Sequence, residues 1–339
     1  MKRSFLMILF ACLVVSVYAR GKKEVVYGVA FYNLENMFDT KHDEGKNDYE
    51  YLPDGRNQWD DHKYQSKLQN MSKVLGLLAT DKVAEGPAII GMSEIENRAV
   101  LEDLLEQPAL ADRGYEIIHY EGEDQRGIEC AFFYNPKLFE LKNSLLVPYV
   151  YLNDSVRKTR GFLIADGMMG GEHFAFIVNH WPSRGAESPA RERAGVQVRA
   201  LKDSLQRIDP QIRIVIMGDM NDDPMDKSMA EALGAKREMK ETGKQDLYNP
   251  WWDTLAGGEG TLKYRGKWNL FDQIVFTGNL LKGKKKHFRY KEHEIFKRDF
   301  LFQTDGKYKG YPFRTRAGNR WMNGYSDHLP TIVYFVKKQ

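Results

Sequence analysis

The sequence predicts an α/β fold in which helices cover packed β-sheets. Nine short runs rich in β-branched and aromatic residues predict strands, and they lie at 25–32, 88–92, 115–120, 130–134, 162–165, 174–178, 212–217, 270–276 and 331–336. Apolar residues spaced three and four apart predict two helices, one around 68–78 and one around 194–205. No Pro- or Ser-rich linker separates these segments, so we expect one domain over residues 20–339.

The composition is that of an ordinary globular protein. The 339 residues include 50 Lys and Arg against 47 Asp and Glu, a formal net charge of +3, 42% hydrophobic residues and two cysteines. These values exclude the collagen-like, disulfide-rich and strongly disordered classes. A chain of this length can bury a sizeable core without disulfides or metal ions.

The first residues predict an export signal. A short basic segment precedes an apolar run over 5–17, and small residues stand before Arg20. This pattern is typical of a cleavable signal peptide at residues 1–19, and it is too short for a membrane anchor. Cys12 lies in a sequence that loosely resembles a lipoprotein attachment box, but the bulky Phe10 favours plain secretion. We therefore expect a periplasmic or extracellular protein with no transmembrane segment.

Removal of residues 1–19 changes the charge and the cysteine count. It takes away two of the 50 basic residues and none of the 47 acidic ones, which leaves 48 against 47 and a charge near +1. Cys130 is then the one cysteine left, so no disulfide within the chain is expected. Its apolar neighbours predict a buried and inert thiol.

Several segments between the predicted strands are polar and rich in glycine. The stretches 41–57, 257–267 and 307–323 are long enough to be functional loops. The stretch 282–298 carries eight basic and two acidic residues with Phe288 and Tyr290 among them. It fits either a nucleic-acid surface or a solvated hairpin.

Three familiar catalytic patterns are incomplete. Gly278 to Lys284 has the spacing of a phosphate-binding P-loop, but Lys285 stands where Ser or Thr is required. Gly91 begins a nucleophile elbow that lacks its final glycine, because Ile95 takes that position. An HExxH zinc motif and paired cysteines are also missing.

A set of polar residues instead lies at or near the ends of the predicted strands: most follow a strand, Asp272 lies within 270–276, and Asp327 and His328 precede the last strand. Ends of packed strands are rigid, so side chains gathered there can form one preorganised site. Each member alone could be a turn residue, a helix cap or a structural histidine. As a set, carboxylates with amide oxygens suit Mg²⁺ or Mn²⁺, while the histidines supply acid–base groups. The members are Asn33, Glu94, Glu96, Asn179, His180, Asp219, Asn221, Asp272, Asp327 and His328.

Six motifs around these residues occur in one order along nearly the whole chain. They are Phe31-Tyr32-Asn33-Leu34-Glu35-Asn36, Ser93-Glu94-Ile95-Glu96-Asn97, Asn179-His180-Trp181-Pro182-Ser183-Arg184, Gly218-Asp219-Met220-Asn221-Asp222, Phe271-Asp272-Gln273-Ile274 and Ser326-Asp327-His328. Together they resemble the endonuclease/exonuclease/phosphatase family. The resemblance implies a four-layer α/β sandwich, with two central mixed β-sheets flanked by helices and the site at one edge.

The resemblance also implies a metal-binding set. Glu94 would bind Mg²⁺, with Mn²⁺ as the alternative, and Asn33 and Asp327 would lie in or near the metal shell. The family commonly has Gln before this glutamate, whereas this chain has Ser93, which affects how Glu94 is positioned. Glu96 would share the face of Glu94 if the strand continues, as a supporting acid or a substrate contact.

By the same resemblance, five residues would carry the catalysis. His328 would contact the phosphate or act as general base, held in one tautomer by Asp272. Asp219 would orient or deprotonate water or help the leaving group, and the sequence leaves the choice between it and His328 open. Asn221 and His180 would donate hydrogen bonds to the phosphoryl oxygens.

Four further residues are candidate substrate contacts. Arg184 and Arg160 could bind phosphate, because a guanidinium matches it bidentately. Tyr264 and Lys267 precede the predicted strand at 270–276 and could line the pocket. Surface or packing roles remain the alternative for each of them.

The sequence therefore predicts a secreted, Mg²⁺-dependent phosphoesterase with a phosphate-ester substrate, monomeric in the favoured case. A nuclease is favoured over an enzyme acting on a phospholipid such as sphingomyelin or on a sugar or inositol phosphate. A catalytically silent phospho-ligand-binding protein on the same fold is a second hypothesis. A third is a glycoside hydrolase that uses Glu94 and Glu96 as its carboxylate pair.

Overall fold

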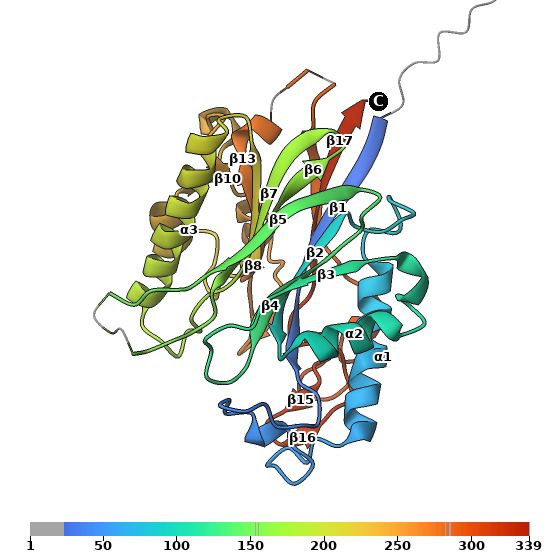
Figure 1. Ribbon diagram of the computed structural model, residues 1–339. Coiled ribbons are helices and arrows are strands. Elements are labelled where there is room, and N and C mark those ends of the chain that lie inside the picture. The colour runs from blue at the N-terminus through green and yellow to red at the C-terminus, as the bar shows by residue number, and fades with distance from the viewer. Residues whose placement is uncertain (1–23, 153, 155, 282, 285, 339) are drawn as a thin grey trace, which may run out of the picture.

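The computed structural model describes residues 24–338 apart from 153, 155, 282 and 285, and two large β-sheets packed face to face form its centre (Figure 1). The predicted signal peptide and Cys12 lie outside the described residues. Within the described part of the chain, no helix is long and apolar enough to cross a membrane.

The first sheet has six strands and is mixed. Strand β1 pairs antiparallel with β17 and parallel with β2, so the two ends of the described chain meet in the middle of this sheet. In spatial order its strands are β14 (Arg289–Ile295), β17 (Thr331–Lys338), β1 (Glu24–Met37), β2 (Ile89–Ile95), β4 (Glu129–Tyr134) and β3 (Glu116–His119).

The second sheet has seven strands and is also mixed. Strands β7 and β8 are parallel, whereas β13 runs antiparallel to β8. In spatial order the strands are β5 (Phe139–Val147), β6 (Phe162–Met169), β7 (Glu172–His180), β8 (Arg213–Asp219), β13 (Asp272–Thr277), β10 (Leu247–Tyr248) and β9 (Ala235–Lys236). Two small hairpins, β11–β12 (Leu262–Tyr264 and Lys267–Asn269) and β15–β16 (Arg316–Ala317 and Arg320–Trp321), lie outside both sheets.

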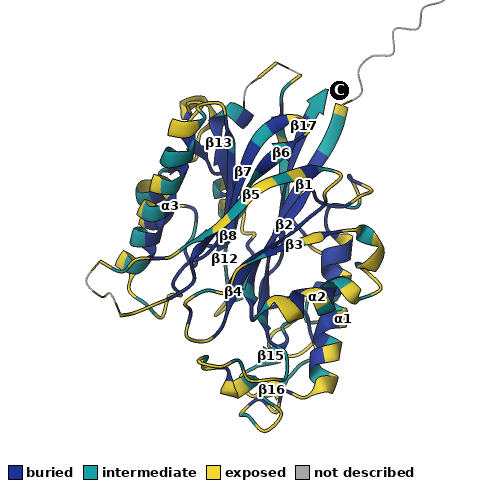
Figure 2. Ribbon diagram, viewed as in Figure 1, coloured by how far each residue is buried: buried dark blue, intermediate teal, exposed yellow. Residues whose placement is uncertain are grey.

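Helices cover the outer face of each sheet. Helices α1 (Asp61–Leu77) and α2 (Arg98–Glu106) pack on the first sheet, and α3 (Ser188–Ile208) packs on the second (Figure 1). Their outward faces are exposed, while the strands between them are largely buried (Figure 2). The predicted four-layer α/β sandwich is therefore confirmed. The short helix α4 (Trp252–Ala256) lies in the connection between β10 and β11.

Side-chain oxygens cap the first two helices. The side chain of Asp60 accepts a hydrogen bond from the Lys63 amide at the start of α1, and Asn97 accepts one from the Val100 amide at the start of α2. Such caps satisfy amides that have no partner inside a helix. Asn97, the last residue of the motif Ser93-Glu94-Ile95-Glu96-Asn97, is therefore the N-cap of α2.

The two sheets approach each other closely at Gly91. A Cβ atom at this position of β2 would lie 2.5 Å from Met217 Sδ and 3.0 Å from Val178 Cγ2, both on the opposite sheet. The glycine that begins the incomplete nucleophile elbow is therefore a packing glycine of the central core.

We expect Gly91→Ala to destabilise the protein by about 1–3 kcal/mol, because the added methyl overpacks the space between the sheets. Urea unfolding measures this change. Gly283→Ala is the matched control, since its Cβ would meet only His287 Cβ, at 3.8 Å. Equal stability of the two alanine variants would contradict this packing.

All nine predicted strand segments contain strand residues, and both predicted helices form. Besides six strands of two or three residues, the sequence missed β5 and β14, which are edge strands with many half-buried or exposed residues. An edge strand that is half solvated lacks the continuous apolar run by which the other strands were found. The predicted burial of Cys130 is confirmed, and burial raises the pKa of its thiol above the usual range.

The basic stretch 282–298 contributes the edge strand β14. Arg289 pairs with Glu24 at the start of β1, Lys297 pairs with Glu259, and Arg298 pairs with Asp81. Asn33, the candidate site residue of β1, lies nine residues further along the strand than Glu24. The start of β14 therefore lies far from it, and several charges of the basic stretch are already compensated.

Candidate active site

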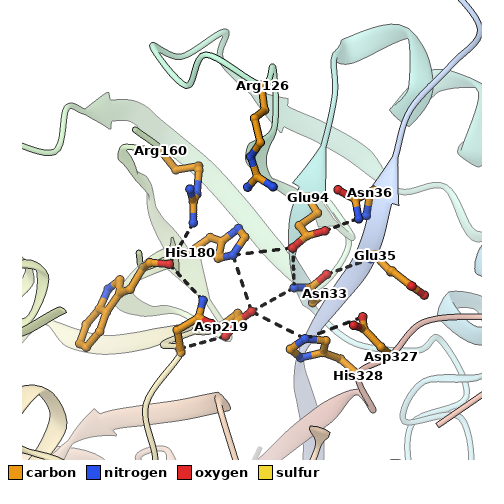
Figure 3. Close-up of polar contacts among 12 residues, drawn as sticks. Asn33, Glu35, Asn36, Glu94, Arg126, Arg160, His180, Asp219, Asp327 and His328 are labelled. Carbon is orange, nitrogen blue, oxygen red and sulfur yellow. Dashed lines mark hydrogen bonds and ion pairs between the residues drawn. The ribbon is translucent and has the colours of Figure 1, made fainter. Parts of the chain in front are cut away.

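The polar residues at the strand ends do converge. Strands β1 and β2 of the first sheet and β7, β8 and β13 of the second bring them to one edge of the sandwich, where the segment before β17 joins them (Figure 3). In the second sheet Asp219 is paired in register with both His180 and Asp272. The structure brings together Asn33, Glu94, His180, Asp219, Asn221, Asp272, Asp327 and His328.

Asn33 links the acids of the two sheets. Its Nδ2 donates to Glu94 Oε1 at 3.3 Å and to Asp219 Oδ2 at 3.0 Å, and its Oδ1 accepts from the Glu35 amide at 2.9 Å. The Asn36 amide donates to Glu94 Oε2 at 2.8 Å. Asn33 thus turns its nitrogen toward the acids, so in this arrangement it positions two carboxylates and does not offer its oxygen to a cation.

His328 is held by the carboxylate of Asp272. Its Nδ1 lies 2.7 Å from Asp272 Oδ2, and its Nε2 faces Asp219 Oδ2 at 3.9 Å and Asp327 Oδ1 at 3.9 Å. Burial disfavours the charged imidazolium, but Asp272 and Asp219 outweigh burial and raise the pKa of His328 well above its ordinary value. His328 therefore favours the protonated form, with Nε2 directed at the acids.

His180 has the opposite preference. Its Nε2 lies 3.6 Å from Asp219 Oδ2 and 3.8 Å from Glu94 Oε1. Burial, helped by the positive charge of Arg160, lowers the pKa of His180 well below its ordinary value. Asn221 lies beside it, where its Nδ2 donates to the Trp181 carbonyl at 3.1 Å and its backbone amide donates to Asp219 Oδ1 at 2.9 Å.

Four residues of the site have left-handed backbone conformations. The φ angles are 49° at Glu35, 54° at Asn36, 62° at Glu94 and 51° at Asn221. Such angles are uncommon outside glycine, and each costs on the order of 1–3 kcal/mol unless the surroundings hold it. Their concentration at one edge marks this edge as a constrained site.

The turn at Glu94 also separates it from Glu96. The register of β2 shifts between Ser93 and Ile95, and the strand ends before Glu96. Glu96 is buried and accepts a hydrogen bond from the Asp39 amide at 2.6 Å. Burial raises its pKa to about 9, so Glu96 is neutral at pH 7. The prediction that Glu96 shares the face of Glu94 required β2 to continue through Glu96, and the strand ends before it. Glu96 does not line the cavity above Glu94.

An open cavity of about 590 Å³ lies over the cluster. Glu94, His180, Asp219, Asn221, Asp327 and His328 line it together with Arg126, Arg157, Lys158 and Arg160. Arg126 points toward the cluster in Figure 3. Arg126 was not predicted as a site residue. The one feature of the sequence that points to it is its place in a glycine-containing loop between two predicted strands.

Arg160 lies at the cavity but is committed to the protein. Its guanidinium lies 3.2 Å from Asp124 Oδ2 and donates to the Trp181 carbonyl at 2.9 Å. The residue is buried. The Trp181 carbonyl accepts a second hydrogen bond from Asn221 Nδ2, so Arg160 also helps to fix the group that positions Asn221.

The structure does not bring Arg184 into the cavity. Its guanidinium pairs with Asp226 at 2.8 Å and Asp223 at 3.2 Å, and it stacks over the Phe271 ring at 4.4 Å. Asp222, at 3.5 Å from Arg184 Nε, is a third carboxylate beside it. These three acids compensate the charge that was predicted to bind a phosphate. Tyr264 lines a neighbouring groove, and Lys267 is exposed on β12 outside both cavities.

A partly buried network of charged residues beside the site was also missed. Arg314 bridges two acids, because its Nε donates to Glu35 Oε1 at 3.1 Å and its NH2 donates to Asp327 Oδ2 at 2.9 Å. The fully buried Lys67 donates to the Tyr325 carbonyl at 2.7 Å and to the Thr315 hydroxyl. Arg314 lowers the pKa of Asp327 although burial acts in the other direction.

The acids of the cluster fit a hard divalent cation. Ligand atoms of Asp219, Asp272 and His328 lie within 4.8 Å of one another. Burial raises the pKa of Asp219 to about 7, and the charges of Asp272 and Glu94 add to this. Asp272 Oδ1 is buried without a hydrogen-bond partner among the described residues. Crowded carboxylates with unsatisfied oxygens are the donor set that Mg²⁺ and Mn²⁺ prefer.

Comparison with known proteins assigns the class. The sequence profile of the endonuclease/exonuclease/phosphatase family matches residues 28–337, and the chain belongs to this family. The family consists of metal-dependent hydrolases of phosphoric esters, so the protein is an enzyme of this class. Among curated proteins, none matches the sequence.

Solved structures show the same fold at low sequence identity. ANGEL2, a 2',3'-cyclic phosphatase, is 12% identical, with a TM-score of 0.59 and coverage of 93% of this chain and 98% of its own. D. rerio TDP2 in complex with a single-strand DNA product is 14% identical, with a TM-score of 0.55 and coverage of 91% and 98%. The mannosyl-6-phosphatase Bt3783 of Bacteroides thetaiotaomicron VPI-5482 is 17% identical, with a TM-score of 0.56 and coverage of 91% and 99%.

Proposed function

We propose that the protein is an exported, Mg²⁺-dependent phosphodiesterase. The observation that carries this proposal is the convergence of Glu94, Asp219, Asp327 and His328 at one open cavity with a cationic rim. The acids suit the metal, and the rim suits an anionic ester. Both features lie on the same side of the cluster, where a phosphoryl group can meet them.

Glu94 and Asp327 would hold the cation, because both carboxylates face the cavity. Asn33 and Arg314 would fix the positions of these two acids. When bound, Mg²⁺ supplies positive charge that neutralises the phosphoryl oxygens. Asp219, Asp272 and His328 are close enough to form a second cation site, but the Asp272–His328 hydrogen bond favours an orienting pair there.

The other residues of the cluster would transfer protons and stabilise the charge of the phosphoryl group. Asp219 would orient the attacking water and take its proton, since a buried carboxylate is a stronger base than an exposed one. His328 would donate from Nε2 to a phosphoryl oxygen, with Asp272 bonded to its Nδ1 and holding the orientation of the ring. His180 and Asn221 would help to stabilise the charge that develops in the transition state.

We expect Arg314→Gln to weaken activation by Mg²⁺ about 10–100-fold, because the groups that hold a metal ligand in place matter at this scale. The measurement is the Mg²⁺ concentration that gives half-maximal rate. Arg316→Gln removes a guanidinium from the same segment but leaves the Glu35–Asp327 bridge intact. If both variants need the same Mg²⁺ concentration as the wild type, Arg314 does not position Asp327.

The substrate class is tested on purified residues 20–339 with Mg²⁺. The panel contains plasmid DNA, RNA, sphingomyelin, mannose 6-phosphate, the chromogenic bis(p-nitrophenyl) phosphate and a set of polysaccharides. We expect hydrolysis of phosphodiesters in preference to the monoester and no cleavage of polysaccharide. Cleavage of polysaccharide alone would favour a glycoside hydrolase, and inactivity on every ester would favour a silent binding protein.

Export is a separate part of the proposal. The basic segment, the apolar run and the small residues before Arg20 support it. We expect the protein expressed in a bacterium to leave the cytoplasm with Arg20 as its first residue, as mass spectrometry of the intact chain would show. A full-length chain in the cytoplasm, or a lipid on Cys12, would contradict this prediction.

A further inference from the structure

A second groove lies next to the catalytic cavity. It has a volume of about 890 Å³ and shares Leu262 and Asp327 with the catalytic cavity. Strand β11 and the turn that follows it, residues 262–266, form one wall, and residues from the segment 303–312 form the other. We call it the aromatic groove and define it by Lys263, Tyr264, Arg265, Lys307, Tyr308 and Tyr311.

Hydrogen bonds between its two ends hold the segment 303–312 in place. The Gln303 amide donates to the Tyr311 carbonyl at 2.9 Å, and the Gly310 amide donates to the Gln303 carbonyl at 2.9 Å. Phe302 and Pro312 form an isolated β-bridge beyond them. These bonds close the loop on itself, so Lys307 and Tyr308 stand at its tip and face solvent.

The groove carries positive charge that the protein does not neutralise. Within the described part of the chain, Lys263, Arg265 and Lys307 have no ion pair with a carboxylate. Their partners are aromatic rings instead. Lys263 Nζ lies 5.0 Å from the centre of the Tyr311 ring, Arg265 lies 5.3 Å from that of Tyr264, and Lys307 lies 5.6 Å from that of Tyr308.

The rings themselves are unusually accessible. Tyr264 is 61% exposed and Tyr308 is 47% exposed. Tyr308 is fixed edge-on against Tyr311, with ring centres 5.3 Å apart. Large exposed rings alternating with uncompensated cations match a chain that alternates flat bases with phosphates.

Resting on the phosphodiesterase function proposed above, we propose that the aromatic groove binds unpaired nucleotides next to the scissile phosphate, which makes single-stranded nucleic acid the substrate. Bases would stack on Tyr264 and Tyr308, and flanking phosphates would lie near Lys263, Arg265 and Lys307. Duplex bases are stacked on each other and cannot reach these rings. A lipid chain is a poorer match, because the cations occupy the neighbourhood of every ring.

The first test compares substrates of different size. Specificity constants are measured with Mg²⁺ on a single-stranded oligonucleotide, the same sequence as a duplex, and bis(p-nitrophenyl) phosphate. We expect the single strand to be preferred over the duplex. Tyr308→Ala should lower kcat/KM on the single strand about tenfold more than on the small diester, because it removes a ring on which one base stacks.

Two variants control for this result. Tyr308→Phe retains the ring and should keep the preference, while Lys309→Ala changes an exposed lysine of the same loop outside the groove. Equal losses by Tyr308→Ala on both substrates, or no preference for the single strand, would overturn the groove proposal. Hydrolysis of the small diester in that case would leave the phosphodiesterase function standing.

Binding is measured independently of turnover. Fluorescence anisotropy in EDTA follows a labelled single strand, and a second titration uses phosphatidylglycerol vesicles. We expect the single strand to bind, with an affinity that falls as salt rises and about tenfold weaker in Tyr308→Ala. Identical affinities for wild type and Tyr308→Ala, or binding to vesicles alone, would contradict the proposal even if the enzyme were inactive on every ester.

Discussion

Asp219→Asn is expected to lower kcat on bis(p-nitrophenyl) phosphate by about 10²–10⁴, the range attributed to a general acid or base. The carboxylate sits where the two sheets meet, with Asn33, His180 and His328 around it. Asparagine keeps the shape of the side chain but cannot take a proton from water. The rate is measured at saturating Mg²⁺, so that a change in metal affinity does not mimic the loss.

The control for this variant is Asp166→Asn. Asp166 lies in β6 and bonds His173, away from the catalytic cavity. It should leave kcat near the wild-type value. A wild-type rate in Asp219→Asn would show that Asp219 neither activates nor orients the nucleophile, and an unfolded variant by circular dichroism would call for Asp219→Glu instead.

Glu94→Gln is expected to lose at least about 100-fold in Mg²⁺ affinity and most of the activity with it, because a metal ligand matters more than the groups that support one. The carbonyl oxygen of glutamine can still accept from the Asn36 amide, whereas its NH2 group would face the Asn33 Nδ2 donor. The loss should come mainly from the missing charge, because the bond that holds the turn at Glu94 is kept. Calorimetric titration of Mg²⁺ measures it directly.

Glu96→Gln is the matched control two residues away. Glu96 faces the Asp39 amide and is already neutral near pH 7 because burial raises its pKa to about 9. We expect this variant to bind Mg²⁺ and to turn over as the wild type does. Equal damage by Glu94→Gln and Glu96→Gln would instead favour a paired-carboxylate mechanism.

Much of the fold and the cluster could be predicted from the sequence. The buried strands are continuous apolar runs, and their ends are marked by polar residues such as Asp219 and His328. The convergence of these residues follows from the face-to-face packing of two sheets whose polar strand ends meet at one edge of the sandwich, and the geometry of Asp272 and His328 matches the orienting pair that the family resemblance implies. Their catalytic roles remain predictions.

Other features depend on contacts that no local pattern encodes. Arg184 follows the His180 motif directly, yet its charge is used by Asp223 and Asp226, which are distant in sequence. Arg314 reaches Asp327 from an irregular segment, and its partner Glu35 is nearly 280 positions away. The turn that separates Glu94 from Glu96 depends on a left-handed backbone conformation at Glu94, which the alternation of apolar and polar residues in a strand does not predict.

The most direct test of the proposed metal dependence is the hydrolysis of a simple diester. Purified residues 20–339 are assayed on bis(p-nitrophenyl) phosphate after EDTA treatment and again after Mg²⁺ is returned. We expect no turnover in EDTA and recovery of the full rate with Mg²⁺ in the wild type, but no recovery in Glu94→Gln. Turnover that persists in EDTA at the wild-type rate would contradict a metal-dependent phosphodiesterase.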